Sequence, residues 1–526
     1  MAARRPLWVW LAPFTAVFGV LLAKNAFLFT TPLHEDADMG AVSILIEQAR
    51  RFTLLVGNYS REKFNHPGPA VLYVQSWGES LFWSVLHLVP TAWNGQLIAL
   101  YALNALFATL VVATGYGWTR TVRGAVAVLA VALAYGALHP AMFSSDWMPY
   151  VYVLPYFAFL VAIASVGAGR YQDSWIAALS GWFLIHGHAS FLFFVPVLSA
   201  AAVALPVIRW VRSRGQPRLS LVSWLRDTRR TWVPVVVISA VFVLPIAIEL
   251  ALHWPGNFAK YFTYSSSSRS GGHTAAQVVR YALWFWWPHA HAWAVPLLLF
   301  AVAGAITWRL PAGPVRRFCV SLLVFDALSS LAFLAYTAIG IDDLTQYYIG
   351  YFYWSAPVIT VLVIALGIVE GLSSAADSVL SWLGVAVAVA AAAAACAAFA
   401  AAPQTRTSTT HTDPADLSTG ADTDPALPAG VARMAVLAAG RPVVLRLAQH
   451  DAWPAMTGVL VQAERTGVRA CVADPGWQFM VTSQFICTPA ELAEGKNFQL
   501  NVPGQVPRGS RVEVRLRRAI VTAAGI

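Results

Sequence analysis

Charged residues are scarce in this sequence. Asp, Glu, Lys and Arg make up 11% of its 526 residues, whereas they make up about 25% of typical soluble domains. Because 58% of the residues are hydrophobic and the mean hydropathy is +0.60, an ordinary soluble enzyme is excluded. Much of the formal charge of +10 lies in short loops between apolar stretches, where basic residues set membrane orientation. The composition predicts a multi-pass membrane protein with no nucleic-acid partner.

Cysteine is also rare, with four in the chain. Cys319 and Cys396 lie in apolar segments, where a thiol usually packs as a small, unreactive apolar group. Cys471 and Cys487 lie in the polar C-terminal part. An extracytoplasmic location would favour a disulfide between them, and the alternative is two buried free thiols.

Long apolar runs dominate the first 400 residues, and each span needs about 20 such residues. The candidate spans are 7–30, 69–89, 97–118, 125–138, 150–168, 175–185, 191–208, 232–252, 293–308, 318–339, 352–369 and 379–401. We expect 11 to 13 transmembrane helices in the plasma (inner) membrane. The first run is too long for a signal peptide and has no small-residue cleavage site, so it is interpreted as a span with a cytoplasmic N-terminus.

Arginine-rich loops orient these spans. Loop 209–230 and loop 309–317 are predicted to be cytoplasmic, as is 119–124, and this places the tail after residue 402 outside. The number of candidate spans is then one too many for this orientation of the loops. Either residues 69–89 form a re-entrant segment, or a short segment such as 175–185 does not cross the membrane. Four polar segments are predicted on the outer face: 31–67, 138–150, 254–291 and 340–354.

The composition and hydrophobic pattern of the C-terminal part differ from those of the first 400 residues. Residues 403–430 are rich in Thr, Asp and Pro and are typical of a disordered linker. From 431 to 526 the pattern is globular: "RPVVLRL" and "VRACVAD" indicate strands, "WPAMTGVLVQAERTG" a helix, and "SRVEVRLRRAIV" an edge strand. The predicted fold is an all-α polytopic membrane domain (1–402) joined to a small extracytoplasmic α/β domain.

Three acids, Glu35, Asp36 and Asp38, follow the first apolar run. They could simply be a solvated loop end, because carboxylates are tolerated where water reaches. They could also form a catalytic site, since transfer of a sugar from a phosphate to a hydroxyl needs a carboxylate to accept the proton. Oxygen ligands of this kind suit Mg²⁺ or Mn²⁺. If the site is wet, a charge-neutral change at Asp36 should barely alter stability.

A rigid polar collar, "NYSREKFNHPGPAVLY", stands before the second apolar run. Pro67 and Pro69 fix the backbone and hold Asn65 and His66 in extended geometry. A helix start with Pro69 in its first turn would explain the prolines equally well. Upstream, "AVSILIEQARRF" predicts an amphipathic helix lying on the membrane, with Glu47 on its polar face.

Further candidate substrate-binding residues are scattered through the outer segments. His186 and His188 flank a glycine in an apolar segment, where histidines satisfied by their neighbours are the simpler interpretation. Asp342 and Asp343 precede several tyrosines, which stack on sugars but also form interfacial belts. Arg269 lies in a Ser/Gly stretch and could close over an anion.

Glu79 and Lys24 are charged residues within apolar segments. Such residues usually face a cavity or each other. They could therefore mark a transport path, which is the basis of a rival hypothesis.

Several motifs together resemble the GT-C superfamily of multi-spanning glycosyltransferases, and more closely an actinobacterial, protein-mannosyltransferase-like group. The motifs are the acidic cluster and "VGNYSREKFNHPGPAVLYV", with its "NHPGP" element. "SSDWMPYVYVLPYF" looks like the Trp-Asn-Pro loop of that group, with Met148 in place of the asparagine and Asp146 nearby, and "SGWFLIHGHASF" looks like its polar-His segment. The resemblance covers about the first 210 residues, and the rest only in layout.

The resemblance implies transfer of a sugar from a polyprenyl-phosphate donor to a cell-envelope glycan, lipid or protein on the outer face. By position, Asp36 matches the catalytic acid, with Glu35 or Asp38 as its neighbour, and His66 matches the family motif. The hypothesis is an inverting glycosyltransferase in which Asp36 deprotonates the acceptor and His66 positions the donor phosphate.

Asn65 and an arginine, Arg61 or Arg269, would assist in holding that phosphate. The alternatives are a transporter or flippase of lipid-linked envelope precursors and a non-catalytic envelope assembly protein.

Overall fold

The computed structural model describes residues 5–212, 229–267, 272–287, 293–374, 386, 390–391, 393–399, 401 and 423–523. The chain forms two compact units that interrupt each other in sequence. One consists of Met1–Lys24 and Tyr101–Gln404, and the other of Asn25–Leu100 and Thr405–Ile526. Residues 25–100 thus group with the C-terminal residues in one unit. The predicted domain boundary at residue 402 stays a prediction.

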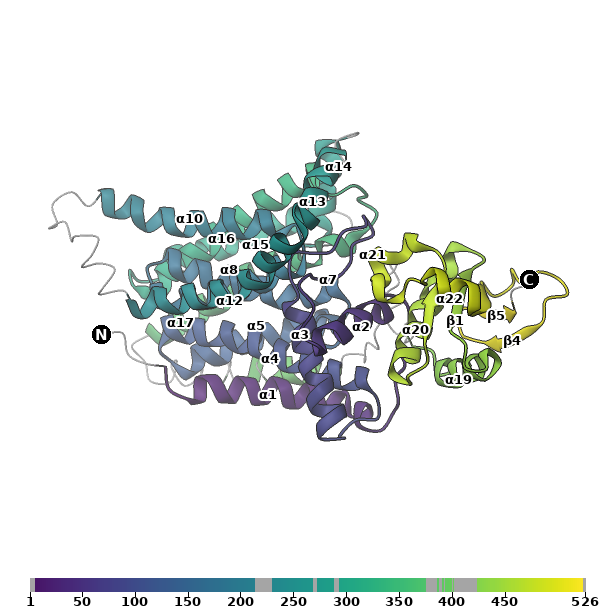
Figure 1. Ribbon diagram of the computed structural model, residues 1–526. Coiled ribbons are helices and arrows are strands. Elements are labelled where there is room, and N and C mark those ends of the chain that lie inside the picture. The colour runs from purple at the N-terminus through teal and green to yellow at the C-terminus, as the bar shows by residue number, and fades with distance from the viewer. Residues whose placement is uncertain are drawn as a thin grey trace. The chain divides into compact units, whose positions relative to one another are not determined.

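The first unit is a helical bundle, whose long helices are drawn in purple to green in Figure 1. Its elements are α1 (Trp8–Lys24), the end of α4 (Ala92–Thr119), α5 (Val122–Leu138), α6 (Ala141–Ser144), α7 (Met148–Val151), α8 (Val153–Gly167), η3 (Tyr171–Asp173), α9 (Ser174–Gly187), α10 (Phe191–Arg212), α12 (Arg229–His253), α13 (Gly256–Ser267), α14 (Ala275–Trp284), α15 (Ala294–Arg309), α16 (Pro314–Ile339), η4 (Tyr347–Trp354) and α17 (Ser355–Ser374).

Helix α8 is the centre of this bundle. Every residue from Val153 to Gly167 is buried, and the helix packs against α9, α10 and α16. A helix that is apolar on all sides has to be enclosed by other helices or by lipid. The sequence of α8 therefore explains why the surrounding helices gather around it.

Five helices in the described part of the chain are long and apolar enough to cross a membrane. They are Ala92–Thr119, Met148–Gly167, Arg229–His253, Pro314–Ile339 and Tyr347–Gly371. Shorter apolar helices accompany them, including α1, α5 and α15. The chain is a multi-pass membrane protein, while the number of 11 to 13 spans stays a prediction.

The two segments singled out as doubtful spans are both short. Residues 69–89 form α3 (Ala70–Gly78), followed by the π-helix η2 (Glu79–Val85). Residues 175–185 lie in α9, which has 14 residues. Both fall below the roughly 20 helical residues that a perpendicular crossing needs.

The second unit joins the segment after the first span to an α/β domain. Its elements are η1 (Ala26–Phe29), α2 (Ala37–Arg50), α3, η2, α19 (Leu427–Ala438), β1 (Val443–Leu447), η6 (His450–Ala452), α20 (Trp453–Arg465), β2 (Ala470–Val472), η7 (Pro475–Trp477), α21 (Gln478–Val481), η8 (Ser483–Phe485), α22 (Pro489–Glu494), β3 (Lys496–Asn501), β4 (Val512–Arg515) and β5 (Ile520–Ala523). Helix α19 begins inside the range predicted as linker.

The sheet of this domain has the order β2-β1-β3-β5-β4. Strand β1 is parallel to β2 and β3, and β5 runs antiparallel to β3 and β4. Helices and strands are visible in yellow-green to yellow in Figure 1. The buried core of the domain also includes Ala41 and Ile44 of α2, so α2 belongs to the core of the C-terminal domain.

The prediction of an amphipathic helix open to a membrane surface is wrong for α2. Eleven of its 14 residues are buried, Glu47 among them, because α20 and α3 cover it. The approach of α20 is close: a Cβ on Gly40 would lie 2.7 Å from the Thr457 hydroxyl oxygen. The Thr457 hydroxyl in turn donates to the Ala37 carbonyl oxygen over 2.9 Å.

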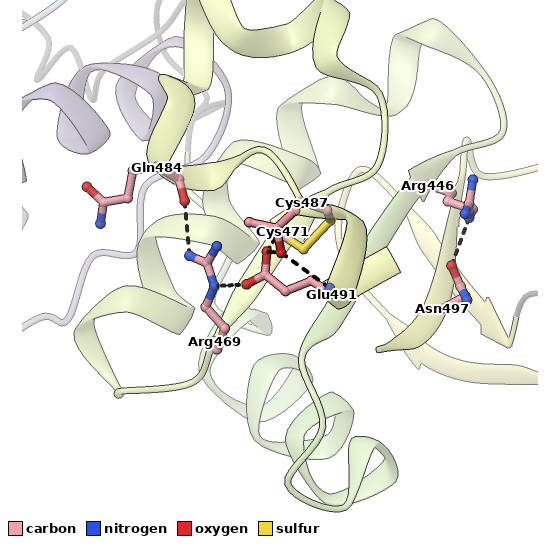
Figure 2. The surroundings of a disulfide bond; sticks show 8 residues. Arg446, Arg469, Cys471, Gln484, Cys487, Glu491 and Asn497 are labelled. Carbon is pink, nitrogen blue, oxygen red and sulfur yellow. Dashed lines mark hydrogen bonds and ion pairs between the residues drawn. A yellow bond between two sulfur atoms is a disulfide. The ribbon is translucent and has the colours of Figure 1, made fainter. Parts of the chain in front are cut away.

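A disulfide joins Cys471, in β2, to Cys487, and Figure 2 shows its surroundings. Beside it, Arg469 donates to the Glu491 carboxylate over 2.5 Å and to the Gln484 carbonyl oxygen over 3.0 Å. The bond and the arginine together tie β2 and the residue before it to the stretch from η8 to α22.

We expect replacement of both disulfide cysteines by alanine to lower the free energy of unfolding of the C-terminal domain by about 3 kcal/mol. The reason is that the bond closes a loop between positions 16 apart, and closing a loop of that size restricts the unfolded chain by about this amount. Thiol counting on the denatured wild-type protein checks that the bond is present: two thiols react before reduction and four after it. Four reactive thiols without reduction would contradict the bond.

Candidate functional site

The acidic cluster lies where η1 leads into α2. Asp36 occupies the N-cap position of α2 but makes no side-chain cap hydrogen bond. Ala37, the next residue, has a φ of +50°, a left-handed conformation that is uncommon for a residue with a Cβ. This turn gives Glu35 and Asp36 different surroundings, although they are adjacent in sequence.

Glu35 is anchored in an ion pair. It is 2% exposed, it accepts from the Ser43 hydroxyl over 2.6 Å, and it lies 2.6 Å from Arg465 of α20. Burial alone would raise the pKa of Glu35, but the Arg465 guanidinium and these hydrogen bonds hold that pKa below its usual value. Glu35 is therefore a fixed anion that holds α20 in place.

Arg465 is the centre of a buried charge cluster that sequence reasoning missed. Besides Glu35, it lies 3.8 Å from Glu47 and 3.9 Å from Glu79. A second arginine, Arg50, lies 3.0 Å from Glu79. The pKa of Arg465, which burial would lower, is raised by these carboxylates. Three acids and two arginines, from α2, η2, α20 and the residue Glu35 before α2, thus form one network of ion pairs.

Asp36 contrasts with Glu35. It is fully buried, and neither carboxylate oxygen has a hydrogen-bond partner among the described residues. In the described part of the chain its one ion-pair contact is long, 3.6 Å to Arg518. Burial raises the pKa of Asp36 to about 7, because the nearby Arg518 offsets only part of the loss of water and Asp424 opposes ionisation. A carboxyl that changes charge near neutral pH can give up or take a proton in turnover.

Helix α20 covers Asp36 directly. A Cβ on Gly458 would come within 3.0 Å of the Asp36 Cβ. The glycine is needed here because the two backbones approach so closely. Asp36 is fully enclosed by protein, whereas a site open to water was considered from the sequence.

The collar is a small hairpin that reaches the third acid. The Gly57 amide donates to the His66 carbonyl oxygen over 2.8 Å, and the His66 amide donates to Asn58 over the same distance. The Asn65 amide group donates within the same hairpin, to the Gly57 carbonyl oxygen. Tyr59 donates its hydroxyl proton to the Asp38 carboxylate. The collar therefore belongs to the same unit as the acids.

Other collar residues differ in exposure. His66 is buried with its ring against Phe64, whereas Arg61 is exposed beside Glu62, at 3.4 Å. The roles of Asn65, His66 and Arg61 in holding a donor phosphate stay predictions.

The remaining candidates belong to the helical bundle. His186 bonds the Phe242 carbonyl oxygen through Nε2 over 2.8 Å, while its buried Nδ1 has no hydrogen-bond partner among the described residues. His188 bonds the Ser190 hydroxyl over 2.9 Å. The roles of both histidines stay predictions. Asp343 accepts from the Thr345 amide in its own turn, and Asp342 is exposed. Arg269 lies outside the described residues.

Two of the predicted outer segments meet within the bundle. Element α7, next to the buried Asp146, packs against η4. Tyr150 and Tyr351 have ring centroids 5.0 Å apart, and Tyr351 stacks on Trp354 at 4.2 Å. The aromatic residues of the two segments thus form one cluster, in which Trp147, the residue after Asp146, has its ring centroid 5.1 Å from that of Tyr348.

The described residues contain no group of three or more His, Cys, Asp or Glu side chains arranged to hold a metal ion. Asp36 faces Arg518, and Asp38 faces Tyr59, so the acids do not converge as ligands. The residues as placed do not fit Mg²⁺ or Mn²⁺, and no step below uses a metal.

No protein-family model matches the sequence, and no curated protein matches it either. Among solved structures, the apo crystal structure of ArnT from Cupriavidus metallidurans superposes with a TM-score of 0.53. The likeness covers 98% of this chain and 97% of that chain at 12% identity. ArnT is a GT-C glycosyltransferase. The chain shares the fold of this ArnT structure. At this identity the likeness establishes the fold alone, and the protein-mannosyltransferase-like subgroup stays a prediction.

Proposed function

We propose that this protein is an integral-membrane glycosyltransferase that moves a sugar from a polyprenyl-phosphate donor to a cell-envelope acceptor. The observation that carries the proposal is Asp36, a buried carboxyl without a hydrogen-bond partner among the described residues. It follows the first apolar helix of a chain that shares the fold of ArnT. Buried polar groups are normally satisfied, so an exception in this position favours a chemical role.

In the proposed reaction, Asp36 accepts the proton of an acceptor hydroxyl as the hydroxyl oxygen attacks the anomeric carbon. The new bond joins that oxygen to the sugar, and the bond from the anomeric carbon to the donor phosphate breaks. The polyprenyl phosphate leaves with its electron pair, and the anomeric configuration inverts. A base with a pKa of about 7 is well matched to this transfer at neutral pH.

The disulfide supports an extracytoplasmic C-terminal domain. Disulfides persist in oxidising compartments and are rare in the cytosol. Because Asp36 lies beneath α20 of that domain, the same face would hold the proposed base.

The test of the proposal uses purified protein in nanodiscs with polyprenyl-phosphate-linked hexoses and pentoses and an envelope extract as acceptor. We expect release of free polyprenyl phosphate that depends on the acceptor. A transporter would instead move labelled donor across liposomes without releasing the phosphate. That result would overturn the proposal.

No observation favours the transporter specifically. Glu79 accepts from Gln96 over 2.7 Å and pairs with Arg50. Lys24 donates to the Phe399 carbonyl oxygen over 2.9 Å. Both charged side chains therefore have partners within the protein, as expected of residues that stabilise the fold.

Asp36 is fully buried, and α20 covers it at Gly458, so we propose that a substrate reaches Asp36 when α2 and α20 separate. We expect that a cross-link between these helices stops turnover. Arg51 and Glu464 form a 2.5 Å surface pair across this contact, so Arg51→Cys and Glu464→Cys can be joined by a short bis-maleimide. Each single cysteine variant, treated in the same way, is the control and should remain active. Full turnover of the cross-linked protein would contradict Asp36 as the base.

A further inference from the structure

The turn between β4 and β5 brings an arginine of the C-terminal domain to Asp36. The Leu516 amide closes this turn by donating to the Ala519 carbonyl oxygen over 2.8 Å, and both residues are buried in the core of the domain. Between them lies Arg518, whose Nε is 3.6 Å from an Asp36 carboxylate oxygen. The two buried ends of the turn therefore fix the backbone that carries this arginine.

A second chain segment ties the same turn to the acidic cluster. The Arg517 amide donates to the Asp424 carboxylate over 2.7 Å, and the Arg517 side chain donates to the Thr423 carbonyl oxygen over 3.1 Å. The Asp424 amide donates in turn to the His34 carbonyl oxygen over 2.9 Å, and Thr423 forms a β-bridge with Glu35. Backbone hydrogen bonds thus link the turn to the two residues that precede the candidate base.

Charged groups of both signs act on Asp36. They are Arg518 and Arg517, which favour the ionised carboxylate, and Asp424 and Glu35, which oppose it. Loss of water is the main reason that the pKa of Asp36 is raised, and Arg518 is the strongest of the groups that counteract this rise. Helix α20 meets Asp36 with Gly458, which brings no charge, and Asp38 of α2 is bonded to Tyr59. Arg518 is therefore the main source of stabilisation for the charged form.

We propose that Arg518 is a positioning residue that acts through Asp36 and keeps this carboxylate ionised, ready to take the acceptor's proton. The inference rests on the proposed function and gives the C-terminal domain a part in the reaction. Neither Asp36 oxygen has a hydrogen-bond donor among the described residues, so a nearby positive charge has to favour the base form. A guanidinium suits this role because it remains charged throughout the physiological pH range.

The first test is the pH dependence of sugar transfer by the wild type and Arg518→Gln. A base has to be ionised, so turnover rises as the pH increases through the pKa of Asp36. An opposite charge within about 4–6 Å lowers a carboxyl pKa by about 1–3 units. We therefore expect Arg518→Gln to move this rise to higher pH by about one unit, with little change in turnover at high pH.

Two further variants show whether the charge of Arg518 is responsible. Arg518→Lys keeps the charge and should return the rise toward the pH of the wild type. Arg511→Gln removes a charge from the same hairpin, at a side chain that is 78% exposed, and should follow the wild type. A loss of turnover by the same factor at every pH would indicate a structural role, and a raised KM for the donor without a pH shift would indicate direct donor binding. Either result would overturn the inference.

A second measurement does not depend on turnover. Melting temperatures are recorded from mildly acidic to mildly alkaline pH for the wild type and Arg518→Gln, each with and without Asp36→Asn. The difference within each pair isolates Asp36, whose contribution to stability falls with rising pH and levels off at its folded pKa. We expect this levelling about one pH unit higher in the Arg518→Gln pair.

The two measurements separate this inference from the proposed function. Levelling at the same pH in both pairs would overturn the role of Arg518, even if Asp36→Asn abolishes turnover. Full turnover by Asp36→Asn would overturn both the proposed base and the residue that supports it, whatever the melting temperatures show.

Discussion

Asp36→Asn is expected to lower sugar transfer by about 100- to 10,000-fold, the contribution of a positioned general base. Asparagine has nearly the same shape but cannot accept the acceptor's proton. Donor binding should be retained, because the proposed donor contacts come from other residues. Turnover and donor binding, measured on the purified protein, check the prediction. Asp451→Asn, at an acid whose side chain is 86% exposed in the same domain, is the control, and full turnover by Asp36→Asn would rule out the base.

The same variant should be more stable than the wild type above pH 7. The folded pKa of Asp36 is raised to about 7, against about 3.9 in an unfolded chain. The folded state therefore keeps a proton that the unfolded state loses, so stability is fully present below about pH 4 and is lost as the pH rises through 7. The loss is on the order of 4 kcal/mol at most.

Asparagine avoids this loss because it does not ionise. We expect equal melting temperatures for both proteins at pH 4 and a higher one for Asp36→Asn at pH 8. A wet site would give no difference at either pH. Destabilisation of the variant at pH 8 would contradict the buried placement of this carboxyl.

Arg465→Met should have the largest effect on the stability of the C-terminal domain. Among the residues that the structure describes, the substitution leaves Arg50 as the one arginine paired with Glu47 and Glu79, and it leaves Glu35 with no ion-pair partner. Breaking a buried ion pair from one side typically costs about 3–5 kcal/mol. Hydrogen exchange should show that α2 and α20 lose protection together, while α8 of the bundle keeps its own.

Arg51→Met is the matched control for this experiment. Arg51 also joins α2 to α20, through Glu464, but its side chain is 57% exposed, and exposed pairs contribute about 0–1 kcal/mol. Adding Glu35→Gln to Arg465→Met should restore part of the lost protection, because it removes the nearest unpaired charge. Similar exchange in Arg465→Met and Arg51→Met would show that the buried cluster does not hold the domain.

The C-terminal domain shows which helices and strands local sequence patterns predict and which they miss. "RPVVLRL" contains β1, and "WPAMTGVLVQAERTG" contains α20, both as predicted. "SRVEVRLRRAIV", predicted as one edge strand, is instead the pair β4 and β5. Strand β3 (Lys496–Asn501) was not predicted, although it pairs with both β1 and β5. Its short mixed sequence gives no distinctive periodic signal, and its place depends on partners far along the chain.

By itself, the sequence determined that the protein crosses a membrane repeatedly and ends in a small α/β domain, because hydropathy and periodicity act over neighbouring residues. Only the tertiary structure decided which acid is anchored by hydrogen bonds and a close ion pair and which has no hydrogen-bond partner among the described residues. Glu35 and Asp36 are adjacent and chemically alike, and their difference comes from Arg465 and Gly458 of a distant helix. An arginine in the last turn of α20 has an ordinary role beside the helix dipole, so its position in the sequence does not reveal that it is buried among three carboxylates.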